Sequence, residues 1–150
     1  MALPPRENIL YLGTWVLPMS DLGNSKNLNI LDHYYDDREK LRHDFEYVKS
    51  LYCEFLPIIG DILNKHHSKA WGSRSLKLVY GVWLQEYLTV MRERFVTIKH
   101  AIDSHPSRLF ILSAAEQTIL DPLDFKRQIT SDGYNLYLYS KIVRFIDPSK

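Results

Sequence analysis

The chain has a single cysteine, Cys53, among its 150 residues, so it cannot form an intrachain disulfide. This sparse use of cysteine fits a reducing compartment, and we expect a cytoplasmic protein. No stretch approaches about 18 uninterrupted apolar residues, so no transmembrane segment is expected. The first residues also lack the basic and then apolar pattern of a signal peptide.

Excess positive charge and glycine-rich motifs are also missing. The net charge is +1, from 19 basic and 18 acidic residues, which argues against a dedicated nucleic-acid binder. Neither the Gly-x-Gly-x-x-Gly fingerprint nor the Walker pattern is present, which disfavours a free-standing nucleotide-binding protein. His66 and His67 have no cysteine or acidic ligand close in sequence, so no metal site is expected from them.

Short apolar runs and long periodic segments dominate what is present. Residues 9–12, 28–31 and 108–112 read as buried strands, and the length fits one domain over residues 1–150. Strands separated by helices predict an α/β fold with a small, mostly parallel three-stranded sheet and a long helical excursion. Three strands make a small sheet, so we expect an incomplete, Rossmann-like half of a larger fold.

The best-defined helix follows the second strand. Its apolar residues alternate steps of four and three, which places them on one helical face. They are Leu41, Phe45, Val48, Tyr52, Phe55, Ile59 and Ile62. Either Asp36 or Asp37 can cap this helix, and Pro57 should kink or divide it.

A second helical region covers residues 76–102, with Gly81 as a candidate interruption. The basic stretch Arg92–Lys99 includes Glu93 and is expected to form a solvated helical face. A last helix carries Tyr134 and Leu138 on its apolar side.

The run His33–Leu41 (HYYDDREKL) is the main candidate site, because ligands of open α/β sheets bind beyond the carboxyl ends of the strands. Asp36 and Asp37 could bind Mg²⁺ through one or two oxygens, or accept a proton from a sugar hydroxyl. The alternative is that one of them caps the helix and both complement its dipole. His33 could act as a general base or be a packed histidine. Arg38 could clamp a phosphate or remain a solvated first-turn arginine.

Three residues elsewhere are further binding candidates. Gly13 follows the first strand, where a phosphate-binding turn would lie, although one glycine is a weak signal. Trp15 could stack on a sugar or a base, or belong to the core. Asn135 at the start of the last helix could bind a hydroxyl group.

Four segments in order resemble a bacterial transferase family linked to surface-polysaccharide (O-antigen-type) loci. They are LGTW (12–15), YYDDREK (34–40), GVWL (81–84) and DGYNLYLY (132–139). The family shows Leu-Gly-Glu-Trp, Tyr-His-Trp-Asp-Asp-Arg-Glu-Lys-like, Gly-Pro-Trp-Leu-like and Asp-x-Trp-Asn-x-x-Leu-Tyr-like elements at these places. This chain departs from that pattern at three positions. Thr14 replaces the acidic residue, Tyr35 replaces a Trp and Val82 replaces a Pro.

Family members are usually several times longer, so the resemblance covers their N-terminal portion. It implies half of a glycosyltransferase-type fold that contributes sugar-nucleotide or acceptor binding. The cofactor stays open, with magnesium and a nucleotide sugar as the candidate that the paired carboxylates suggest. If the acid replaced by Thr14 is catalytic in the family, this chain has lost it.

Two hypotheses follow from different classes. In the first, the chain is a carbohydrate-related transferase domain with weak or no turnover alone. In the second, it is a non-enzymatic interaction module, a shortened relative that binds a protein partner completing the fold through an exposed apolar surface.

Overall fold

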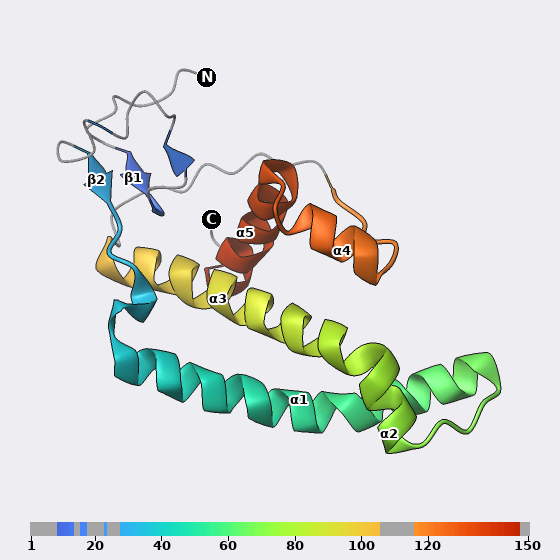
Figure 1. Cartoon of the computed structure of the whole chain (residues 1–150). Coiled ribbons are helices and arrows are strands. Elements are labelled where there is room, and N and C mark those ends of the chain that lie inside the picture. Colours follow the sequence, from blue (N-terminus) through green and yellow to red (C-terminus); the bar gives the residue numbers. More distant parts are fainter. Residues whose placement is uncertain (1–8, 14–15, 18–22, 24–27, 106–115, 148–150) are drawn as a thin grey trace.

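The computed structural model describes residues 9–13, 16–17, 23, 28–105 and 116–147. Most of these residues are helical, and two short strands precede the helices (Figure 1). In chain order the elements are β1 Leu10–Tyr11, β2 Asn29–Ile30, the 3-10 helix η4 Tyr34–Asp36, α1 Arg38–His67, α2 Ser73–Leu76, the π-helix η5 Lys77–Gly81, α3 Val82–Ser104, α4 Pro122–Gln128 and α5 Asp132–Ile146.

The predicted α/β fold with a three-stranded sheet is wrong. Among the described residues the sheet has two parallel strands of two residues each, paired in the register Leu10↔Asn29 and Tyr11↔Ile30. The expected third strand, residues 108–112, lies outside the described residues. The fold is mostly helical because α1 and α5 each bury apolar side chains against α3, which lies between them.

Helix α1 begins and ends where local chemistry predicts. Asp37 is its N-cap, and Ser68 ends it in the left-handed conformation with φ 51°. The last turn carries Lys65, His66 and His67, whose positive charge, where present, complements the helix dipole. Pro57 does not divide this helix, which runs through it to His67.

Helix α3 lies in the middle of the molecule, antiparallel to α1, with α5 on its other side (Figure 1). Two apolar clusters hold this arrangement together. The cluster between α1, α2 and α3 consists of Val48, Leu56, Leu76, Leu84 and Leu88. The cluster between α3 and α5 consists of Ile98, Tyr134, Leu138, Tyr139, Ile142 and Val143.

The interruption expected at Gly81 is a π turn. Residues Ser73–Ser104 form one helical run in which η5 separates α2 from α3. Both C-terminal helices begin at side-chain caps, because Asp121 accepts from the backbone N–H groups of α4 and Ser131 accepts from that of Tyr134. None of the helices in the described part of the chain is long and apolar enough to cross a bilayer.

Candidate functional site

The two strands end at the same edge, and the predicted site begins there. Their parallel pairing continues through the Leu31 N–H, which donates to the Tyr11 carbonyl at 2.8 Å. Gly13 and His33 therefore follow neighbouring strands on one side of the pair. Gly13 is buried, so it can shape this edge but presents little surface to a ligand.

The polar run after β2 forms a tight turn and then the first turn of α1. The His33 Nδ1 accepts a hydrogen bond from the Tyr35 N–H at 3.3 Å and caps η4. The Asp37 Oδ1 accepts from the Glu39 N–H at 2.9 Å and from the Lys40 N–H at 3.4 Å. Of the two alternatives for the acidic pair, capping is therefore the observed role of Asp37.

Asp36 and Arg38 flank this cap and are both exposed. Asp36 closes η4, and Arg38 is the first residue of α1. The structure thus places His33, Asp36, Asp37 and Arg38 in one surface turn.

An open depression of about 600 Å³ lies beside this turn, on the first three turns of α1. Both signs of charge line it. Its lining residues are Tyr34, Asp37, Glu39, Lys40, Arg42, His43 and Glu46. Lys40 lies over the Tyr34 ring, with its amine 5.1 Å from the ring centre. Of the predicted residues, only Asp37 lines this depression.

A buried ion pair beneath the turn was missed by the sequence reasoning. The Asp44 side chain on α1 is only 3% exposed, and its Oδ1 lies 2.6 Å from a terminal guanidinium nitrogen of Arg92 on α3. The Tyr35 hydroxyl donates to the Asp44 Oδ2 at 3.1 Å. The Tyr47 ring centre lies 4.7 Å from the guanidinium carbon of Arg92, at cation–π distance.

These contacts shift the ionisation of all three groups. Burial opposes the charge on Asp44, but the hydrogen bond and charge of Arg92 hold its pKa below the usual value. Burial also opposes the charge on Arg92, and the Asp44 carboxylate raises its pKa nevertheless. Burial, with the Asp44 charge beside it, raises the pKa of Tyr35 well above that of a free phenol. At neutral pH the cluster therefore contains a carboxylate, a guanidinium and a neutral phenol.

Asn135 lies in a second polar cluster, between α3 and α5. Its Oδ1 accepts from the Arg94 Nε at 3.1 Å, and its Nδ2 donates to the carbonyls of Ile129 and Ser131 at 3.1 and 3.0 Å. Arg94 also pairs with Glu93. Both ends of the Asn135 amide are thus engaged in fixing the start of α5, which is a structural role.

The expected solvated face at Arg92–Lys99 is therefore wrong in its first part. The side chains of Arg92 and Arg94 are 21% and 22% exposed, because each is drawn into an interhelical cluster. Lys99 does lie at the surface, where it pairs with Asp103 at 2.8 Å.

A sequence signal for the Asp44–Arg92 pair did exist. Asp44 stands four residues before Val48 and eight before Tyr52, on the apolar stripe of the predicted helix. A carboxylate on a buried stripe needs a cation or several hydrogen-bond donors. The identity of that partner could not be read, because Arg92 is 48 residues away.

The donor set at the turn permits only limited contact with magnesium. No group of three or more His, Cys, Asp and Glu side chains suited to a metal ion occurs among the described residues. Asp36 and the remaining oxygen of Asp37 could supply one or two ligands, with phosphate oxygens completing the shell. Trp15 lies outside the described residues.

These features define a small, mostly helical protein with a charged turn at the end of a parallel strand pair. The chain belongs to the LIC12162 family transferase group, whose family model matches residues 2–149. Comparisons with curated proteins and with solved structures give no match. Membership of this family supports a transferase function in general terms.

Proposed function

We propose that the chain serves a carbohydrate-related transferase reaction of surface-polysaccharide biosynthesis in the cytoplasm. In this proposal the turn from His33 to Arg38 and the adjoining depression bind the sugar nucleotide or the saccharide acceptor. The observation that carries it is the position of this turn at the N-terminus of the long helix α1, beside a depression that Lys40 and Arg42 line.

The charges around the depression suit a phosphorylated sugar. Lys40 and Arg42 line it and can attract a diphosphate, and Arg38 in the same helical turn can add a bidentate contact. Asp36 is exposed and caps no helix, so it is the better candidate than Asp37 for accepting a proton from a hydroxyl group. His33 stands next to the carboxylates and is the second candidate base.

An NMR titration of the purified chain with UDP-glucose, with and without Mg²⁺, tests the proposal. We expect saturable amide shifts at Asp36, Asp37 and Arg38, and weaker binding by Asp36→Asn when Mg²⁺ is present, because Asp36 would then lose its contact with the metal ion. The matched control is Asp103→Asn, which removes an exposed carboxylate from α3. A well-dispersed spectrum that does not change at millimolar ligand would contradict the proposal for this chain.

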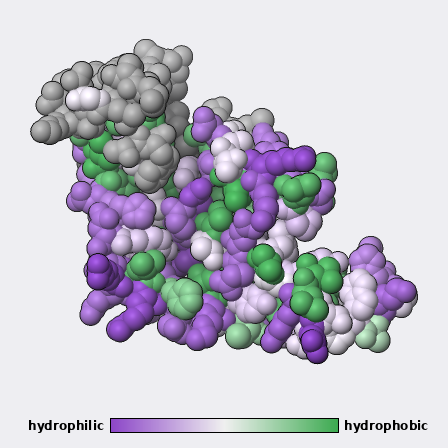
Figure 2. Space-filling view, viewed as in Figure 1, coloured by the Kyte–Doolittle hydropathy of each residue, from purple (hydrophilic) through white to green (hydrophobic). Residues whose placement is uncertain are grey.

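A second candidate function, binding of a protein partner, is favoured by the outer face of α1. Several large apolar side chains on that helix are exposed, among them Phe45 at 62% and Ile62 at 61%. Figure 2 shows hydrophobic areas interspersed with hydrophilic ones on the visible face of the molecule. Sedimentation velocity on the chain and on a Phe45→Ser, Ile62→Ser double variant tests for self-association. A monomer at all concentrations in both proteins would count against a homotypic partner.

A further inference from the structure

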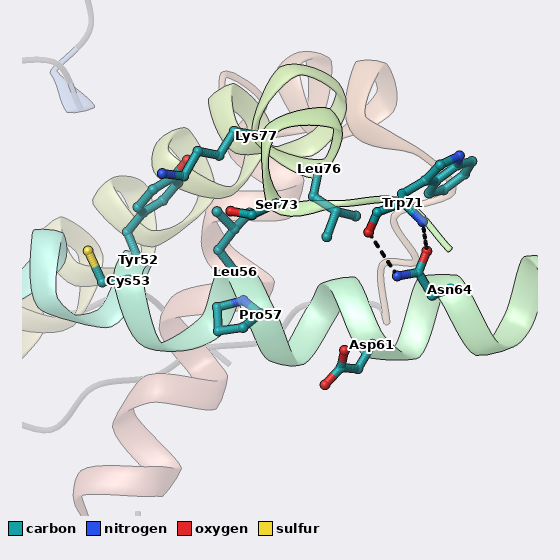
Figure 3. Close-up of a pocket in the computed structure, with 10 residues that line it drawn as sticks. All are labelled: Tyr52, Cys53, Leu56, Pro57, Asp61, Asn64, Trp71, Ser73, Leu76 and Lys77. Atoms are coloured by element: carbon teal, nitrogen blue, oxygen red, sulfur yellow. Dashed lines mark hydrogen bonds between the residues drawn. The ribbon is translucent and has the colours of Figure 1, made fainter. Parts of the chain in front are cut away.

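A groove of about 460 Å³ lies at the other end of α1, between this helix and the run from Trp71 to Lys77 (Figure 3). Its volume falls within the range of roughly 300–1,000 Å³ that small-molecule sites occupy. It shares no lining residue with the depression beside the His33–Arg38 turn. The groove is therefore a separate candidate site, to which the proposed function gives no role.

Two hydrogen bonds between Asn64 and Trp71 fix one wall of the groove. The Asn64 Nδ2 donates to the Trp71 carbonyl at 3.1 Å, and the Asn64 Oδ1 accepts from the Trp71 N–H at 2.8 Å. This pairing ties the loop after α1 back onto the helix (Figure 3). Leu76 then packs closely against Gly60, where an added Cβ would lie 2.4 Å from the Leu76 Cδ1. The wall is thus held in place without a ligand.

The π turn η5 contributes its first residue, Lys77, to the adjacent wall. A π turn contains one residue more than an α turn, which rotates the side chains before it by about 100° relative to those after it. Such turns occur frequently at functional sites. Here the turn runs from Lys77 to Gly81, and a Cβ on Gly81 would lie 2.6 Å from the Tyr52 hydroxyl oxygen. Glycine at this position therefore lets Tyr52 lie against the π turn and beside Lys77.

The chemistry of the groove combines an apolar base with one cation, Lys77, and one carboxylate, Asp61. Leu56, Pro57 and Leu76 provide the apolar surface, and Pro57 has no N–H for the carbonyl of Cys53, which also lines the groove. Lys77 supplies the positive charge, next to the Tyr52 ring and hydroxyl.

Two further polar side chains line the groove. The Ser73 hydroxyl lines the groove near Lys77, and the Asp61 carboxylate lines it from the far side of α1 (Figure 3). Lys77 and Tyr52 also border an adjoining depression that contains Lys126 and Glu86, which lie 3.3 Å apart. Lys77 is the only lysine or arginine among the described residues that line the groove.

We propose that this groove binds a small anion with an apolar ring, an aryl phosphate in its simplest form. The ring packs on Leu56, Pro57 and Leu76, and the anionic group contacts Lys77 and Ser73. A polyol would suit the groove less well, because most of its hydroxyl groups would face Leu and Pro side chains without partners.

Titration of the whole chain with phenyl phosphate, followed by amide shifts, tests this site. We expect saturable shifts at Tyr52, Ser73 and Lys77, and about tenfold weaker binding after Lys77→Gln, the effect of losing one charge-assisted contact. The control is Lys49→Gln, which removes an exposed lysine from helix α1 outside the groove. It should leave the affinity for phenyl phosphate unchanged.

Two simpler probes separate the contributions of ring and anion. Inorganic phosphate and benzyl alcohol should each bind more weakly than phenyl phosphate at the same residues. Equal binding of inorganic phosphate, or no shift at Tyr52, Ser73 and Lys77, would overturn the proposal. Shifts from phenyl phosphate only at Asp36–Arg38 would also overturn it, whereas failure of UDP-glucose to bind there would count only against the proposed function.

Discussion

Removing the charge of Asp44 should destabilise the protein more than any change at an exposed carboxylate. Asp44→Asn keeps the side-chain size but leaves the Arg92 guanidinium, 21% exposed, without its counter-charge. Breaking a buried pair typically costs about 3–5 kcal/mol, and partial exposure of Arg92 places this case near 3 kcal/mol. For a chain of this length that corresponds to a loss of roughly 6–12 °C in melting temperature.

The assay is urea and thermal unfolding followed by circular dichroism at pH 7. Asp103→Asn is the control, because its Lys99 pair is exposed and should be worth less than about 1 kcal/mol. A double-mutant cycle with Arg92→Gln isolates the pair itself. A coupling energy below about 0.5 kcal/mol would refute the assignment of Asp44 and Arg92 as a stabilising pair.

The Asp44–Arg92 pair should also make the stability of the fold depend on pH. The pKa of Asp44 is lower in the folded than in the unfolded protein, so its stabilisation is fully present above the unfolded value of about 3.9. It is lost as the pH falls through the folded pKa. The stability difference between the native chain and Asp44→Asn should therefore be constant from about pH 5 to 8 and shrink below about pH 4. A difference that grows on acidification would contradict this sign.

Three further changes test other contacts. The pKa of Tyr35 is raised in the folded state, so native stability should fall as the pH rises above about 10, and Tyr35→Phe should flatten that decline in alkaline unfolding curves. Asp37→Ala should cost about 1 kcal/mol in urea unfolding, the usual price of a helix N-cap, and Asp37→Ser should recover most of it. Asn64→Ala should increase amide exchange at Trp71 without changing that of α5. Equal exchange at Trp71 in the variant and the native chain would show that the hydrogen bonds to Asn64 do not hold this loop in place.

The helices could be predicted because their signals are local. Apolar spacing, Asp37 and Asp121 as caps, and the charged last turn of α1 all act within a few residues of one another. The sheet could not be predicted in the same way. A short apolar run such as residues 28–31 is compatible with a core strand or with a brief extended connection, and periodicity does not separate them. Here the paired part is only Asn29–Ile30, and long helices supply the core.

The apolar stripe of α1 was predicted correctly as a helix but only partly as a buried face. Val48 is 5% exposed, whereas Phe45 and Ile62 on the same predicted stripe are each more than half exposed. The buried positions Asp44, Val48, Leu56 and Gly60 are spaced by multiples of four, so the contact with α3 and α2 moves around α1 along its length. An ideal stripe of mixed steps of three and four misses that drift.

The candidate site shows the same division between local and distant information. Capping and ligand binding both require a carboxylate at the start of a helix, so sequence alone could not separate these roles for Asp36 and Asp37. The structure separates them by geometry, since the Asp37 oxygen accepts two backbone N–H groups and Asp36 does not cap α1. The buried ion pair between Asp44 and Arg92 lies beneath the turn and contacts it through the Tyr35 hydroxyl. Substitution at that buried pair should therefore disturb the turn itself, whereas substitution at Asp36 should change binding and leave the fold intact.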